Sequence, residues 1–210
     1  MERTMNGMSK TKHILVFALL ATWQVVFGEN VTYTELAALS NAWSSGVKEY
    51  EYAAMPELLR LHPTESATQG VSNWIVDVLR FDDSAGTNKM EDCILEKNTL
   101  LWIASSRRLV DISIIGEEIV DFAGRLDAAR VAAEETVSNV ATNTPRQSGL
   151  RSPTSEESLL FALRHTRDNL LPYLRQYWAS QPDEQKAMCR SNIVERARLT
   201  EDEASSVFYE

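Results

Sequence analysis

Histidine is scarce in this sequence, and the patterns in which histidine binds a metal or assists catalysis are absent. His62 and His165 belong to no His-Glu-x-x-His arrangement, and neither stands near a cysteine at the spacing of a zinc site. The serine-hydrolase elbow, the phosphate-binding loop and the dinucleotide fingerprint are missing too. We therefore predict no catalytic residue, no metal site and no cofactor.

The chain also lacks an apolar run long enough to span a membrane. The N-terminal run Ile14 to Phe27 has fourteen residues and would rise about 21 Å as a helix, against a hydrocarbon core of roughly 30 Å. Lys10 and Lys12 precede this run and Gly28 follows it, which is the order of parts in a secretory signal. We therefore expect residues 1–28 to be a cleaved signal peptide and the mature protein to be secreted and extracellular, with a signal anchor as the alternative.

Basic residues are outnumbered, with 21 lysines and arginines against 30 aspartates and glutamates, for a formal net charge of -9. Residues 1–28 carry a net +2 from Arg3, Lys10 and Lys12 against Glu2, so their removal leaves the mature chain near -11. Nucleic acids and anionic membrane surfaces both require clustered basic residues, and the sequence contains no such cluster. We therefore expect neither as a partner.

Cysteine is rare as well, since Cys93 and Cys189 are the two in the chain. An even number of cysteines in an exported protein favours one intramolecular disulfide, with two buried thiols or a bridge between chains as alternatives. The bridge would close a loop of about 97 residues, which the chain-entropy model values at roughly 4 to 5 kcal/mol. Asn30 begins the sequon Asn30-Val31-Thr32 and is a candidate glycosylation site.

Alternation with a period of two is absent beyond a few residues, whereas apolar residues recur at steps of three and four. The sequence therefore predicts an all-α fold, a bundle of five or six helices within a single domain over residues 29–210. No repeat at solenoid spacing is visible, which favours a compact bundle over an array. A helix should kink or restart at Pro56, and Pro172 should bend another helix. The proline-containing segment 143–155 is interpreted as a flexible linker.

The helix boundaries follow from capping residues. A capping box predicts one helix start at Thr32, Ser66 or Thr68 is expected to cap the next helix, and Thr154 and Pro182 mark two later starts. The long helical stretch 89–141 needs a break, for which Ser105-Ser106 is the first candidate and Gly116 the alternative.

Within that stretch, a heptad seam runs from Ile112 to Val140 and is expected to pack on the protein's own helices. The carboxylate pairs Glu117-Glu118 and Glu134-Glu135 are interpreted as a solvated face.

Four tryptophans, each on a different expected helix, are the candidate ligand-binding residues: Trp43, Trp74, Trp102 and Trp178. If they converged on one interior space, they would line a pocket for an apolar ligand. The simpler interpretation is that large aromatic side chains anchor the core.

The sequence is most consistent with a secreted, non-enzymatic helical protein that binds another macromolecule, expected to be an extracellular protein, through its surface. The alternative is an extracellular carrier that holds a small apolar ligand between helices, and an enzyme of unrecognised type is third. A closed cavity above about 300 Å³ would favour the carrier. A buried carboxylate or histidine in a cleft would favour the enzyme. No oligomeric state is implied.

Overall fold

The computed structural model describes residues 28–49, 52–81, 90–143 and 155–208. These residues form eight α-helices and no strand, so the all-α prediction is confirmed. The helices are α2 (Gly28–Glu49), α3 (Ala54–Arg60), α4 (Glu65–Arg80), α5 (Met90–Ser106), α6 (Ile112–Asn143), α7 (Ser155–Ala179), α8 (Asp183–Arg196) and α9 (Glu201–Phe208). The expected number, five or six, was too low because the short segments α3 and α9 are helices of their own.

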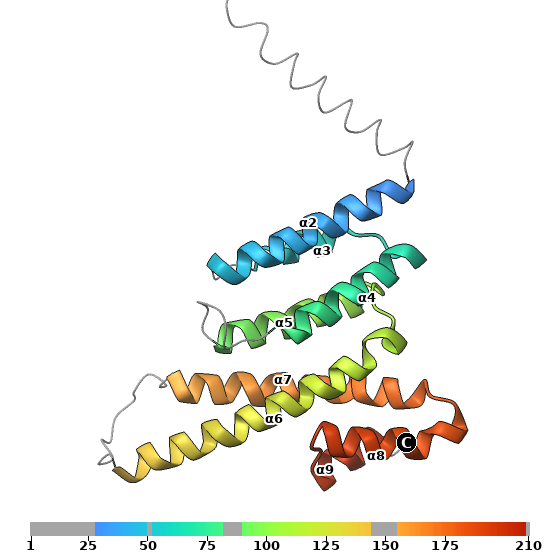
Figure 1. Cartoon of the computed structure of the whole chain (residues 1–210). Helices are drawn as coiled ribbons and strands as arrows, with labels where there is room; N and C mark the ends of the chain where they lie inside the picture. Colours follow the sequence, from blue (N-terminus) through green and yellow to red (C-terminus); the bar gives the residue numbers. More distant parts are fainter. Residues whose placement is uncertain (1–27, 50–51, 82–89, 144–154, 209–210) are drawn as a thin grey trace, which may run out of the picture.

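The helices stack in chain order as layers of two (Figure 1). α2 packs on α3, α4 on α5 and α6 on α7. Contacts of α2 with α4 and of α3 with α5 join the first layer to the second, and contacts of α4 with α6 and of α5 with α7 join the second to the third. The helices α8 and α9 pack on the layer formed by α6 and α7, on its side away from α4 and α5. The described chain is therefore a layered stack instead of the expected compact bundle, built without a sequence repeat.

Several helix boundaries agree with the capping prediction and others differ. α5 ends at Ser106, as expected, and Thr200 and Glu203 exchange two capping hydrogen bonds of 2.8 and 3.2 Å at the start of α9. The cap of α4 is Thr64 instead of Ser66 or Thr68, since the Thr64 hydroxyl accepts from the Ala67 amide at 3.1 Å. α2 already includes Gly28, so the helix does not start at Thr32 as predicted.

Both prolines are accommodated inside helices. Pro56 is the third residue of α3, where its missing amide hydrogen is not needed by the helix. Pro172 lies within α7, which continues to Ala179. Of the predicted linker 143–155, the structure describes the two end residues, which belong to α6 and α7. The predicted signal peptide lies outside the described residues except for Gly28.

The seam of α6 packs on the protein's own helices, as expected. Its buried members are Ile115, Ile119, Phe122, Leu126 and Ala133, and α6 contacts α4, α7 and α8.

Gly116, the alternative position for a helix break, lies within α6. A Cβ atom at this position would lie 2.0 Å from the ring of Tyr177 on α7, so the glycine allows the two helices to approach closely.

Basic side chains of α5 and α6 hold the C-terminal end of α4. The buried Lys97 ammonium donates to the Phe81 carbonyl at 2.7 Å and lies 5.8 and 5.3 Å from the ring centroids of Phe81 and Phe122. Arg125 donates to the Leu79 carbonyl at 2.8 Å. Positive charge is favourable beside the last carbonyls of a helix, so these contacts fix α4 against its two neighbours.

One carboxylate that was expected to belong to a solvated face is buried in ion pairs. The Glu118 side chain is 5% exposed and lies 2.6 Å from Arg80 and 3.0 Å from Arg125. The solvated-face interpretation was therefore wrong for Glu118, because α4 supplies an arginine that the spacing within α6 does not reveal. Glu134 is 34% exposed and pairs with Arg130 of α6 at 2.9 Å and with Arg164 of α7 at 2.7 Å, which is compatible with a solvated face.

Arg167 is the most connected buried cation in the described chain. Its guanidinium donates to the carbonyl oxygens of Ala123, Ala197 and Arg198 at 2.8–2.9 Å. It also makes a two-pronged contact with Glu203, at 2.7 and 2.9 Å. One side chain of α7 therefore ties together α6, the end of α8 and the start of α9.

The predicted disulfide is wrong, because Cys93 and Cys189 are not bonded to each other. Both side chains are buried, but Cys93 belongs to α5 and Cys189 to α8. The layer formed by α6 and α7 stands between these helices (Figure 1). The prediction required the last helices to return to α5, and they pack on α6 and α7 instead.

Candidate functional site: a polar groove between α5 and α7

The four candidate tryptophans do not share one environment. Trp43 and Trp74 are buried and pack edge to face, with ring centroids 6.5 Å apart. Trp178 packs on Phe208 at 5.5 Å, near the C-terminal end of the chain. Trp102 is 63% exposed. Core anchoring therefore explains Trp43 and Trp74, and Trp102 requires another explanation.

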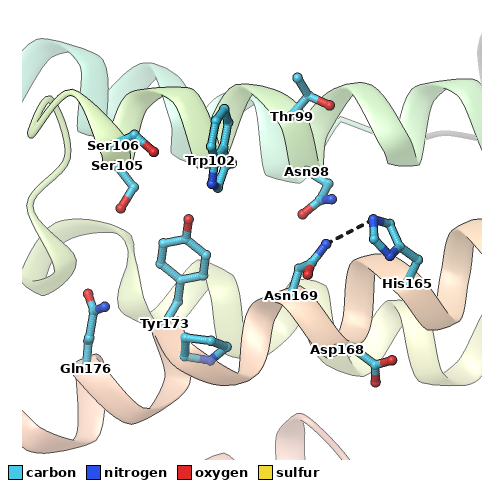
Figure 2. Close-up of a pocket in the computed structure, with 11 residues that line it drawn as sticks. Asn98, Thr99, Trp102, Ser105, Ser106, His165, Asp168, Asn169, Tyr173 and Gln176 are labelled. Atoms are coloured by element: carbon cyan, nitrogen blue, oxygen red, sulfur yellow. Dashed lines mark hydrogen bonds between the residues drawn. The ribbon is translucent and has the colours of Figure 1, made fainter.

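Trp102 lines a groove of about 560 Å³ between α5 and α7 (Figure 2). This volume is within the range of roughly 300 to 1,000 Å³ that is typical of ligand sites. The groove is open to solvent, and most of its lining residues are polar. The lining residues are Asn98, Thr99, Trp102, Ser105, Ser106, His165, Asp168, Asn169, Pro172, Tyr173 and Gln176.

One wall of the groove comes from a polar stripe on α5. Asn98, Thr99, Trp102, Ser105 and Ser106 follow one another at helical spacing, so they share a face. The opposite side of the same helix is buried in the core. Figure 2 shows Trp102 extending from α5 toward α7, with Asn98 and Ser105 on either side of it.

The other wall comes from α7. Tyr173 points from α7 toward α5 (Figure 2). Burial raises the pKa of Tyr173, and the nearby Ser105 side chain opposes that rise. The amide nitrogen of Asn169 lies 3.2 Å from Nε2 of His165, and the imidazole is stacked in parallel on Phe161, with centroids 5.6 Å apart. These contacts orient the side chains of the wall.

The groove offers neutral hydrogen-bonding groups and little charge. Among its eleven lining residues, Asp168 is the single carboxylate, and lysine and arginine do not occur. Three carboxamides, from Asn98, Asn169 and Gln176, supply both donors and acceptors. The arrangement can bind and orient a neutral, polar ligand.

A second hollow of about 500 Å³ lies between the end of α7 and α8, and includes Glu117, Tyr177, Met188 and Cys189. The Tyr177 hydroxyl donates to Glu117, which also accepts from Arg196. The Tyr177 contact lowers the pKa of Glu117, and burial together with the same contact raises the pKa of Tyr177. Burial also raises the pKa of the Cys189 thiol. Glu117 and Tyr177 are thus engaged with each other and with the fold.

The two histidines considered in the sequence analysis, His62 and His165, are both exposed. Within the described ranges, no group of three or more metal-type ligands comes together. No helix in the described part of the chain has the length and apolar character to cross a membrane. Asn30 belongs to α2, and its side chain lies outside what the structure describes.

Comparisons with known proteins found no matching family model, no similar curated protein and no similar solved structure. The function is therefore argued from the groove itself. Sequence reasoning singled out Trp102 but not its neighbours, although a signal was present. On α5, the only aromatic residue stands four residues after Asn98 and three before Ser105, on a face that is otherwise polar.

Proposed function

We propose that this protein is a secreted, non-enzymatic binding protein that recognises another macromolecule through the groove between α5 and α7. The exposure of Trp102 is the observation that supports this most strongly. A folded chain normally covers most of an indole side chain, and exposed tryptophans are enriched among the residues that dominate binding energy at interfaces. Here the indole lies among side chains that can form hydrogen bonds with a partner.

The two alternative functions have less support. An apolar carrier needs a closed apolar interior, whereas both described hollows are open and lined by many polar side chains. An enzyme would be favoured by a buried acid within a cleft. Glu96 is buried, and burial raises its pKa to about 7, but it lines neither hollow.

Secretion is proposed from the N-terminal sequence, in which Lys10 and Lys12 precede a short apolar run that ends before Gly28. Expression of the full chain in a secretory host should release a product that begins at or near Glu29, as read by N-terminal sequencing. A released product that retains residues 14–27 would contradict the signal-peptide proposal.

Binding through the groove can be tested by site-specific cross-linking. A photoreactive amino acid replaces Ser106 in one variant, because Ser106 is an exposed residue of the groove lining and its replacement leaves Trp102 in place. In a matched control it replaces Met188, which is also exposed, at 71%, but lies in the second hollow. Both variants are presented to cell surfaces and extracellular matrix of the source organism. We expect adducts with an extracellular macromolecule from position 106 and none from position 188. Equal adducts from both positions, or none from position 106, would refute the proposed site.

A further inference from the structure

We propose that the ligand of the groove is a neutral saccharide chain. This inference rests on the proposed binding function and adds the chemistry of the ligand to it. Three features of the groove lead to it: an exposed indole, a set of carboxamides and hydroxyls around that indole, and the near absence of charge.

The indole supplies a platform for a sugar ring. A pyranose has C–H bonds on its faces and hydroxyl groups around its edge, so it needs a flat apolar surface bordered by polar groups. The negative face of an aromatic ring attracts such polarised C–H bonds. Trp102 is 63% exposed and lies on the α5 wall between Asn98 and Ser105, with Tyr173 on the opposite wall (Figure 2). A ring stacked on Trp102 would therefore have its hydroxyls beside polar side chains of both helices.

The carboxamides match the edge of a sugar. Each carboxamide has one acceptor oxygen and two donor hydrogens, and two neighbouring sugar hydroxyls offer one donor and one acceptor side by side. Asn98 and Asn169 face each other from α5 and α7, and Gln176 lies farther along α7. The contact between Asn169 and His165, 3.2 Å long, holds one of these amides in place before a ligand arrives.

Charge and shape distinguish a neutral saccharide from other ligands. A phosphorylated, sulfated or sialylated ligand is bound most strongly by arginine or lysine, and the lining contains neither. An extended peptide requires apolar pockets for its alternate side chains. The apolar lining is limited to Trp102, Pro172 and the ring of Tyr173, so the groove offers a single platform instead of a row of pockets.

The test uses the purified mature protein and defined sugars. An array of neutral oligosaccharides of two to six units, together with neutral N-glycans, identifies binders, and calorimetry measures their dissociation constants. We expect Trp102→Ala to weaken binding by about tenfold or more, because it removes the stacking platform. Asn169→Ala should weaken binding by a few-fold. Met188→Ala, which changes an equally exposed side chain outside the groove, should leave the dissociation constant within about twofold.

Two further comparisons identify the source of the saccharide and distinguish a failure of the saccharide proposal from a failure of the proposed binding function. Free oligosaccharides are compared with glycopeptides that carry the same glycan, which distinguishes a polysaccharide from a glycoprotein as the source. Partners captured at position 106 are tested again after complete enzymatic deglycosylation. Capture that survives deglycosylation while no free sugar binds would overturn the saccharide proposal and leave the binding function intact. Sugar binding that is equal in Trp102→Ala and the wild type would overturn the assignment to this groove.

Discussion

Replacing Arg167 by methionine tests how the C-terminal half of the chain is held together. Methionine fills a similar length with apolar atoms and removes every donor. The change leaves the carbonyl oxygens of Ala123, Ala197 and Arg198 without their shared partner and removes both contacts to Glu203. The Arg167 side chain is 4% exposed, so water cannot simply take its place.

The expected loss of stability is large. Removing one partner from a buried charged pair typically costs about 3 to 5 kcal/mol, because the groups left behind are desolvated and unpaired. A domain of ordinary size has a total stability of about 5 to 15 kcal/mol. The melting temperature should therefore fall by roughly 6 to 20 °C. Glu203 is 18% exposed, and it reaches water most easily if α9 detaches, so hydrogen exchange should accelerate first in α9.

Urea and thermal unfolding followed by circular dichroism measure the change, and hydrogen exchange locates it. Arg164→Met is the matched control, because Arg164 lies one turn earlier on α7, is 58% exposed and makes one ion pair with Glu134. That variant should lose less than about 1 kcal/mol. The loss of stability in Arg167→Lys should lie between the losses in the two methionine variants, since one ammonium cannot reach all the acceptors. A loss below about 1 kcal/mol for Arg167→Met, or equal losses for both methionine variants, would refute the reasoning.

Three further predictions concern other buried groups. Gly124→Ala should destabilise the protein by about 1 to 3 kcal/mol in urea unfolding, because the new Cβ would lie 2.1 Å from the carbonyl oxygen of Arg196. Glu96→Gln should stabilise the protein above pH 7. Burial raises the pKa of Glu96 from 4.5 to about 7 in the folded protein. The folded state therefore gains stability from the protonated carboxyl group below pH 4.5, and it loses this stability as the pH rises through 7. The total loss should be about 1 to 3 kcal/mol. Cys93 and Cys189 should react with a thiol reagent only after unfolding, since their exposures are 1% and 9%.

Each of these predictions has a contradicting outcome. A Gly124→Ala variant as stable as the wild type would show that α8 does not approach α6 at that residue. For Glu96, the control is Glu195→Gln at an exposed position of α8, and the same pH dependence of stability in both variants would indicate that Glu96 is not desolvated. For the cysteines, the absence of reactive thiols in the denatured, unreduced protein would mean that they are bonded.

Local pattern was sufficient to predict the longer helices. In α4, apolar residues recur at steps of three and four, and all of them are buried: Val71, Trp74, Ile75, Val78 and Leu79. Their shared face follows from helix geometry alone. The order of the layers was not predictable in this way. An apolar stripe shows that a helix is covered but not which helix covers it, and this is why the disulfide and the compact bundle were expected in error.

The candidate site was predictable only in part, because the sequence does not show how neighbouring helices are placed. Trp102 was a candidate from its residue type, but its exposure depends on the distance that α7 keeps from α5. Charged residues were harder still. Lys97 and Arg167 have no local sequence feature that distinguishes them from solvated residues, and both are buried. The carbonyl acceptors of Arg167 lie 30 to 44 residues away in sequence, so no local spacing predicts them.

The helix α7 has the groove on one face and Arg167 on the other. His165, Asp168 and Asn169 line the groove, while Thr166 and Arg167 between them are buried. A binding surface on such a helix is already ordered before its ligand arrives, so little conformational entropy remains to be lost on association. Free and bound forms should therefore differ by less than about 1 Å along this wall. Weakening the Arg167 contacts should reduce affinity from the far side of the helix, without any change in the residues that touch the ligand.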